Sequence, residues 1–335
     1  TTLSLAGANI PEMMEGVDFL AKEESDYVFG YRDRADDCYE VARSVYDGRY
    51  LYIRHFMPQL PYYQNALIFN KGGSYAEMNR LRDAGELTDA AKKMYATKPV
   101  EILYDLQEDP LEQNNLATKP VMKEKLEELA RELDEWMIRH RDTGLLTEGI
   151  MMQQASQSKE SVFAISRAYS EESFKEVLEV AKMVGKINDL SAVIPFLDSD
   201  LESARFWGLI GIDAYQGDIG QVHSDLIRLL SDDAPAVAIK AAEILIKRKD
   251  NNAAYEVLKN MLLLEEEVQV LQAAISVRRL GLKAKPLIPI ITEEIFPKYS
   301  GEIWGRYKNW SYPMFIGMAL DQVQINCGID VPKRK

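Results

Sequence analysis

The first third of the chain carries short apolar runs that suit β-strands. These runs are rich in Val, Ile, Tyr and Phe, residue types that favour extended backbone, and they cover residues 27–29, 41–45, 50–56 and 101–106. Asp47-Gly48 separates the second run from the third and is a strong hairpin signal. We therefore predict four antiparallel strands, which need a cover over their apolar face.

The pattern becomes helical after residue 120. Met122, Leu126, Leu129, Leu133 and Met137 recur at three- and four-residue spacing, so they form one apolar stripe over residues 121–140. Thr118 is the expected N-cap, and Pro120 suits the first turn. This helix is the predicted cover of the sheet, which makes the first part of the chain an α+β fold.

From about residue 158 the helical period continues, and part of it repeats. Leu197 and Leu230 each precede an acidic turn and a helix, at an offset of 33 residues, and Ala242 aligns with Ala274 at an offset of 32. A unit of this length cannot bury its apolar face alone, so neighbouring units stack. The pattern resembles HEAT-like repeats, and we predict an all-α HEAT-like solenoid after the sheet.

Composition excludes some partners. The formal net charge of −13 opposes non-specific nucleic-acid binding, and no apolar run approaches the length of a membrane span. Cys38 and Cys327 lie far apart without metal-binding spacing, so free thiols are favoured over a disulfide. Lys247-Arg248-Lys249 is expected at a helix end, where cations complement the dipole. We predict no nucleic-acid partner and no membrane insertion.

The stretch 101–117 is the most informative in the chain. It contains Leu103-Tyr104-Asp105-Leu106, then Asp109-Pro110, Glu112 and Asn115-Leu116-Ala117. From the residues alone it is a strand followed by a turn. It resembles the C-terminal signature of the formylglycine-dependent sulfatases, members of the alkaline-phosphatase-like superfamily. The hairpin 42–53 is similar to theirs too, with Leu51 where lysine is usual.

The resemblance spans about residues 1–145, and the long connection 57–98 is similar to bacterial sulfatases near the heparan N-sulfatases (sulfamidases). It implies a sulfatase C-terminal subdomain at residues 1–147, of which 1–20 would end an absent N-terminal catalytic domain. A HEAT-like domain would follow at 148–325, and a tail at 326–335. The implied reaction is hydrolysis of sulfate esters or sulfamates of glycosaminoglycan-like carbohydrates. The implied location is periplasmic or extracellular.

The chemistry of that family is not encoded in this chain. The family makes its formylglycine in a Cys/Ser-x-Pro-Ser-Arg motif, and neither the two cysteines nor any serine begins one. Its calcium ion is held by Asp and Asn oxygens, which are hard ligands suited to that cation, but nothing identifies Asp36-Asp37 with that site. We therefore assign no catalytic or metal residue. Calcium and formylglycine are expected in the missing N-terminal region, and this chain alone is predicted to be inactive.

A role in substrate recognition remains open. In the family the loop before the hairpin lies near the active-site mouth, and here it includes Arg32, Asp33 and Arg34. Arginine offers a planar fork for sulfate and carboxylate groups, and aspartate accepts from sugar hydroxyls. We predict that these three residues bind the sulfated carbohydrate. The alternative is an exposed charge cluster that neutralises itself.

Two other classes of function stay open. One is a non-catalytic interaction module with a protein partner on the helical repeats. The other is a related phosphatase or phosphonate hydrolase. A group of aromatic residues near the C-terminus either stacks on sugar or packs against the protein: Trp304, Tyr307, Trp310, Tyr312 and Phe315.

Overall fold

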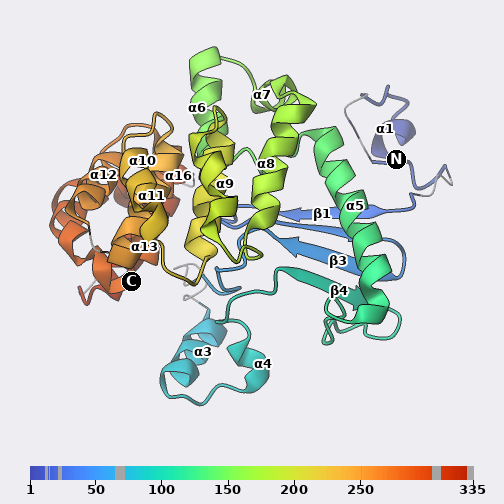
Figure 1. The fold of residues 1–335 in the computed structure, drawn as a ribbon, viewed down its shortest axis with the longest axis horizontal. Helices are drawn as coiled ribbons and strands as arrows, with labels where there is room; N and C mark the ends of the chain where they lie inside the picture. Colours follow the sequence, from blue (N-terminus) through green and yellow to red (C-terminus); the bar gives the residue numbers. More distant parts are fainter. Residues whose placement is uncertain are drawn as a thin grey trace. The chain divides into compact units, whose positions relative to one another are not determined.

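A computed structural model describes residues 1–11, 14, 16–21, 25–64, 72–249, 251–303 and 311–329 (Figure 1). The chain divides into two compact units. The first unit comprises Thr1–Tyr31, Arg43–Arg54 and Glu101–Leu133, and the second comprises Arg32–Ala42, His55–Val100 and Asp134–Lys335.

A four-stranded antiparallel sheet dominates the described part of the first unit. Its strands, in the order β1-β2-β3-β4, are β1 (Val28–Arg32), β2 (Ala42–Tyr46), β3 (Tyr50–His55) and β4 (Glu101–Asp105). The turn between β2 and β3 uses Gly48 at φ 94°, a conformation that glycine adopts without strain. β3 pairs with β4 from Tyr50↔Asp105 to Arg54↔Glu101. The predicted sheet is confirmed.

The first part of helix α5 (Lys123–His140) covers this sheet. Leu129 and Leu133 are buried, and Lys125 lies 3.2 Å from Asp47 in the β2–β3 turn. A short 3₁₀ turn, η1 (Pro120–Met122), precedes the helix and has Lys119 as its N-cap. The predicted cover is confirmed, but Thr118 as the cap is wrong, because the first turn begins at Pro120. Near the N-terminus, α1 (Thr2–Leu5) is a single turn.

The signature stretch completes the sheet edge. The Asn115 Oδ1 atom accepts hydrogen bonds from the backbone amides of Leu103 (3.0 Å) and Ala117 (2.9 Å), and its Nδ2 donates to the carbonyl oxygen of Glu101 (3.0 Å). The Leu116 amide donates to the Leu103 carbonyl at 2.8 Å. Asn115 therefore satisfies backbone groups of β4 on the side that β3 does not reach.

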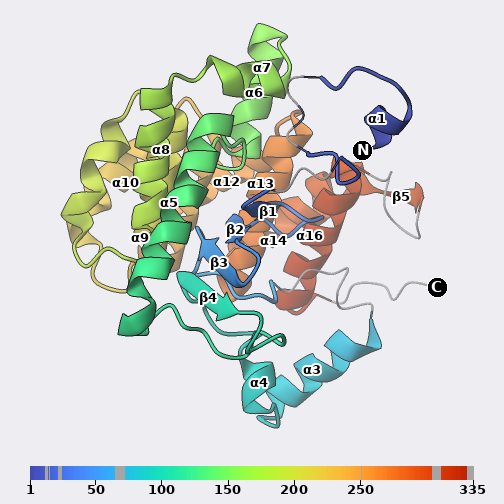
Figure 2. The ribbon, with the colours of Figure 1, turned by 90° about the vertical axis from the view of Figure 1, so that its right-hand side faces the viewer.

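The second unit is mostly helical (Figure 2). Its long connection holds α3 (Gly73–Asp83) and α4 (Asp89–Lys92). The α-helices that follow are α6 (Glu148–Ser158), α7 (Val162–Ala168), α8 (Glu171–Met183), α9 (Glu202–Ala214), α10 (His223–Leu229), α11 (Pro235–Lys249), α12 (Asn252–Leu262), α13 (Glu267–Arg279), α14 (Ile288–Ile290), α15 (Phe296–Tyr299) and α16 (Tyr312–Asn326). Shorter elements between them are η2 (Leu190–Ala192), η3 (Ile194–Asp198), η4 (Gly220–Val222), η5 (Gly281–Leu287), the π-helical η6 (Ile291–Ile295) and strand β5 (Ser300–Ile303).

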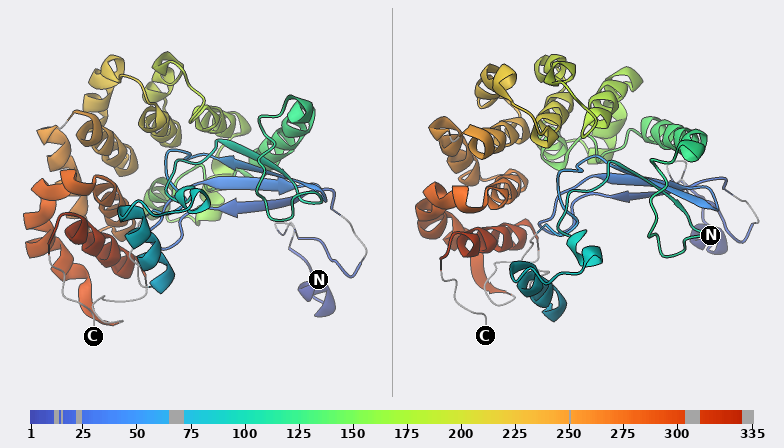
Figure 3. Two further views of the ribbon diagram at one scale, coloured as in Figure 1. Left: turned by 90° about the horizontal axis from the view of Figure 1, so that it is seen from below. Right: turned by 60° about the horizontal axis from the view of Figure 1, so that its bottom comes forward.

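The helices of this unit stack in sequence order, as a curved row in Figure 3. Helix α9 packs on α11, α11 on α13, and α13 on α16, while α8, α10 and α12 pack on α9, α11 and α13 respectively. The starts of α9, α11 and α13 at Glu202, Pro235 and Glu267 reproduce the predicted spacing. The stacked helices are confirmed, whereas their assignment as HEAT-like repeats and the domain boundaries stay predictions. No helix in the described residues is long and apolar enough to span a bilayer.

Candidate functional site

Segment 32–42 follows β1 and carries the three predicted recognition residues. The Arg32 side chain is 46% exposed, and its Nε lies 2.6 Å from an oxygen of the buried Glu40 carboxylate. The other Glu40 oxygen accepts from Lys98, which is also buried. Burial disfavours the charged form of Lys98 and lowers its pKa, against the attraction of Glu40. Asp33 is partly buried. Arg32 is therefore an exposed side chain paired with an internal carboxylate.

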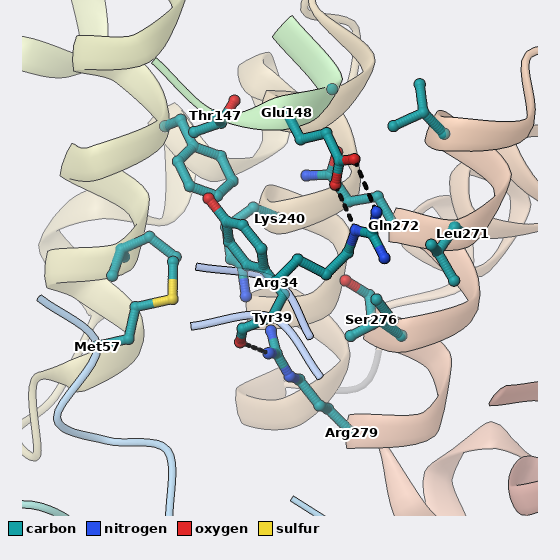
Figure 4. A pocket seen from close by; sticks show the side chains of 15 residues that line it. Arg34, Tyr39, Met57, Thr147, Glu148, Lys240, Leu271, Gln272, Ser276 and Arg279 are labelled. Carbon is teal, nitrogen blue, oxygen red and sulfur yellow. Dashed lines mark hydrogen bonds and ion pairs between the residues drawn. The ribbon is translucent and has the colours of Figure 1, made fainter. Parts of the chain in front are cut away.

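Arg34 is less exposed than Arg32 and forms its contacts within the second unit. It binds Glu148 at the start of α6 through two bonds, Nε–Oε2 at 2.5 Å and Nη2–Oε1 at 3.0 Å (Figure 4). Its guanidinium also lies over the rings of Tyr312 (5.2 Å) and Phe315 (5.6 Å) of α16. Burial opposes its charge, but Glu148 outweighs burial and raises the pKa of Arg34. Arg34 thus joins segment 32–42 to two helices as a permanently charged link.

The two aromatic residues on Arg34 belong to the C-terminal group named from the sequence. Tyr312 donates its hydroxyl to Glu148, and burial together with that carboxylate raises the pKa of Tyr312 to about 12. Both rings pack against the protein rather than projecting freely. Trp304, Tyr307 and Trp310 lie outside the described residues.

A small cavity lies beside Arg34, as Figure 4 shows. Its volume is about 30 Å³, which has room for roughly two water molecules and none for a sugar ring. Its polar lining comes from Arg34, Tyr39, Thr147, Glu148, Lys240, Gln272, Ser276 and Arg279. Arg34 is the one predicted recognition residue among its described lining residues. The recognition role of Arg32, Asp33 and Arg34 stays a prediction.

The backbone is strained at the N-terminus of α6. Thr147, the N-cap, has φ 56° and ψ 138°, and its side chain makes no capping bond. A β-branched residue in this region of φ is a genuine outlier, held in place by its surroundings at a cost of about 1–3 kcal/mol. Thr147 directly precedes Glu148, the first residue of α6 and the partner of Arg34. The sequence carries no signal for this geometry.

The end of helix α13 supplies contacts that the sequence did not reveal. Arg278 forms a buried ion pair with Asp37, and its Nη2 donates to the Asp37 carbonyl at 2.7 Å. Arg279 donates from Nη2 to the Tyr39 carbonyl at 2.8 Å. Asp37 and Arg278 are separated by 241 positions in the chain. Asp37 is therefore part of an internal ion pair.

The described residues do not fit a calcium–formylglycine centre. Within the described ranges, no group of three or more His, Cys, Asp and Glu side chains is placed to hold a metal ion. The printed sequence has no Cys/Ser-x-Pro-Ser-Arg motif. Both cysteines are free, as predicted, and burial raises the pKa of Cys38 to about 11. No reaction step is assigned to this chain.

Comparison with known proteins gives a partial match. No family model matches the chain. It is 35% identical over 152 residues to an "Ulvan-active sulfatase" of Formosa agariphila, covering 44% of this chain and 26% of the relative. A second "Ulvan-active sulfatase" of that organism is 31% identical over 146 residues, covering 41% of this chain and 27% of the relative. The chain thus spans about a quarter of the length of these curated relatives. These matches support a sulfatase-like relationship for the chain.

Proposed function

We propose that this chain is the C-terminal part of a carbohydrate sulfatase that hydrolyses sulfate esters or sulfamates. The observation that carries the proposal is the 35% identity to an ulvan-active sulfatase over 152 residues. The antiparallel sheet with its covering helix is consistent with a sulfatase C-terminal subdomain. The substrate class is a sulfated polysaccharide, of the ulvan or glycosaminoglycan kind, and the finer likeness is to the sulfamidase-like bacterial sulfatases.

The proposal places the formylglycine and the calcium ion outside these 335 residues. A cation and an activated nucleophile would supply sulfate transfer there, in a periplasmic or extracellular protein. The 335-residue chain by itself is then inactive. The stacked helices of the second unit, which we assign to HEAT-like repeats, would serve as an accessory domain.

Within this chain, segment 32–42 would contribute to substrate recognition. Arg32 is the best-placed contact, because its side chain is 46% exposed while its Nε is paired with the buried Glu40 carboxylate. Arg34 would position segment 32–42 rather than contact the substrate, because its guanidinium already donates two hydrogen bonds to the Glu148 carboxylate. Asp33, between them, would accept from a sugar hydroxyl.

The decisive experiment compares the 335-residue chain with the complete gene product. Both are incubated with ulvan and heparan sulfate fragments, and released sulfate is measured by ion chromatography. We expect release by the complete protein and none by the 335-residue chain. Release of sulfate by the 335-residue chain would contradict the proposal that the catalytic centre lies outside it. A complete protein that cleaves phosphate or phosphonate substrates instead would support the related-hydrolase alternative.

The role of Arg32 is tested in the complete protein. Arg32→Ala should lower kcat/KM by roughly ten-fold, the loss expected for one charge-assisted contact. The control is Arg80→Ala, which removes an exposed arginine paired with Glu77 on α3. Equal activity of both variants would favour the self-neutralising charge cluster.

One observation favours a second candidate. The similarity to sulfatases covers less than half of this chain, while the stacked helices occupy most of the second unit. Stacked helices create extended surfaces that bind protein partners. Absence of sulfate, phosphate and phosphonate hydrolysis by the complete protein would support a non-catalytic interaction module.

A further inference from the structure

A basic pocket lies within the second unit, at the C-terminal ends of α11, α13 and α16. Its volume is about 270 Å³, and its described lining includes Lys247, Arg278, Arg279, Gln64 and Asn326. Helix α13 packs against both α11 and α16, and Figure 2 shows α13 beside α16. No carboxylate occurs among the described lining residues. In a chain of formal net charge −13, this gathering of cations calls for a physical explanation.

Two of the three cations already have carboxylate partners. Lys247 Nζ lies 2.6 Å from Glu243 and 3.1 Å from Asp213, and Arg278 is paired with Asp37. Lys240 shares the carboxylates of Glu243 and Asp213 with Lys247. Arg279 is the third of the lining cations.

Arg279 is the lining cation whose hydrogen bonds all go to neutral groups. Its Nη2 donates to the Tyr39 carbonyl at 2.8 Å and to the Gln64 side-chain oxygen at 3.4 Å, and both acceptors are neutral. Among the described residues it has no carboxylate within ion-pair distance, although its side chain is partly buried. Charges withdrawn from water are normally paired. The guanidinium of Arg279 therefore interacts with the Glu243 carboxylate only beyond ion-pair distance, and it lines a pocket with room for an anion.

The helix ends oppose an anion but do not prevent its binding. Backbone carbonyls at helix C-termini carry partial negative charge. In α11 these carbonyls are occupied, because Lys283 Nζ donates to those of Ile246 (2.8 Å) and Lys247 (3.1 Å). A full guanidinium charge in direct contact outweighs partial dipoles at the pocket edge. The expected affinity is modest and depends on Arg279.

We propose that this pocket binds an oxyanion through Arg279, either an inorganic sulfate or a sulfate group on a sugar. The planar fork of arginine suits oxyanions, and the side chains of Gln64 and Asn326 line the same pocket. The volume is near the lower limit of small-molecule sites, roughly 300 Å³. Arg279 also lines the small cavity beside Arg34, but none of the residues 32–34 is among the described lining of this pocket. The choice of sulfate rests on the proposed function, whereas binding itself is measured without turnover.

The test is calorimetric titration of the 335-residue chain with sodium sulfate, against sodium chloride at equal ionic strength. We expect saturable binding of sulfate that Arg279→Gln weakens by roughly ten-fold and Arg279→Lys restores in part. Arg248→Gln is the matched control, because Arg248 also ends a helix and donates to a backbone carbonyl, that of Tyr215. It should bind sulfate normally.

A sulfated disaccharide and its unsulfated form identify the source of the anion. Tighter binding of the sulfated sugar than of sulfate names a saccharide ligand, and equal binding names the inorganic ion; both support the site. Gln64→Glu provides a second variant that keeps Arg279. It places a carboxylate beside the guanidinium and should abolish binding. Absence of saturable sulfate binding, or equal weakening by Arg248→Gln and Arg279→Gln, would overturn the proposal.

Discussion

The buried ionic network of the stacked helices gives the sharpest stability prediction. Glu243 on α11 is fully buried, and its Oε2 lies 2.5 Å from Lys240 Nζ and 2.9 Å from Ser276 Oγ on α13. Its other oxygen lies 2.6 Å from Lys247 Nζ. Glu243→Gln preserves the shape of the side chain but removes the charge that both lysines face.

The expected loss is large because the partners stay buried. Burial opposes the charged form of Glu243, and the neighbouring cations, Lys240 first, overcome it and hold the pKa of the carboxyl well below its usual range. Removing one partner of a buried ion pair costs about 3–5 kcal/mol. At roughly 2–4 °C per kcal/mol for a domain of this size, the unfolding temperature should fall by about 10 °C.

Thermal and urea unfolding, followed by circular dichroism, measure this loss. The control is Glu256→Gln, whose carboxylate is exposed and 3.4 Å from Lys259, and it should change the unfolding temperature by less than about 2 °C. Adding Lys240→Met to Glu243→Gln should recover part of the loss, because it removes one of the stranded charges. Equal effects of Glu243→Gln and Glu256→Gln would show that the buried network does not stabilise the fold.

The pH dependence of the unfolding temperature tests whether the charged form of Glu243 stabilises the folded state. A carboxyl whose pKa is depressed in the folded state stabilises it above the ordinary pKa of 4.5 and loses that contribution as the pH falls through the folded-state pKa. The difference in unfolding temperature between wild type and Glu243→Gln should therefore be constant above about pH 5.5 and shrink below about pH 4.5. A difference that grows on acidification would contradict the assignment.

Three further predictions concern other parts of the chain. Asn115→Ala removes three hydrogen bonds to the backbone and should cost about 2–3 kcal/mol in urea unfolding, whereas Asn114→Ala should cost under about 0.5 kcal/mol. Gly185→Ala meets side-chain atoms at 2.7 and 2.8 Å, while Gly281→Ala meets nothing within 4 Å. Both have positive φ, so a larger fall in unfolding temperature for Gly185→Ala isolates the clash, and equal falls would exclude it. Burial raises the pKa of Cys38 to about 11, so its thiol should react with a disulfide reagent at pH 8 only after unfolding.

Local patterns predicted the elements of this protein well. The hairpin was predicted from Asp47-Gly48, and Gly48 does adopt the positive φ that the turn needs. Ser170 caps α8 by accepting from the amide of Ser173, as serine at that position favours. These features depend on contacts within a few residues, which spacing and residue type specify directly. The prediction of Thr118 as an N-cap was wrong, because the first turn begins at Pro120 and Lys119 is its N-cap.

The ion-pair partners of the charged residues in the candidate site were not predicted from the sequence. Sequence identified Arg32, Asp33 and Arg34 as one cluster, but the fold separates their roles. Arg32 remains half exposed on Glu40, while Arg34 is paired with Glu148, 114 positions away. Lys247 was expected to complement a helix dipole, and it also completes a buried network with Asp213 and Glu243. Ion-pair partners are chosen by packing, which sequence distance does not encode.

The sequence by itself determined the strands, the hairpin, the covering helix and the spacing of the stacked helices, because periodicity and turn chemistry are local properties of the chain. The tertiary structure alone decided which charges are buried together, where Thr147 is strained and that Arg279 lines a basic pocket. Those outcomes depend on segments far apart in the chain meeting at low dielectric, where burial makes each pairing matter.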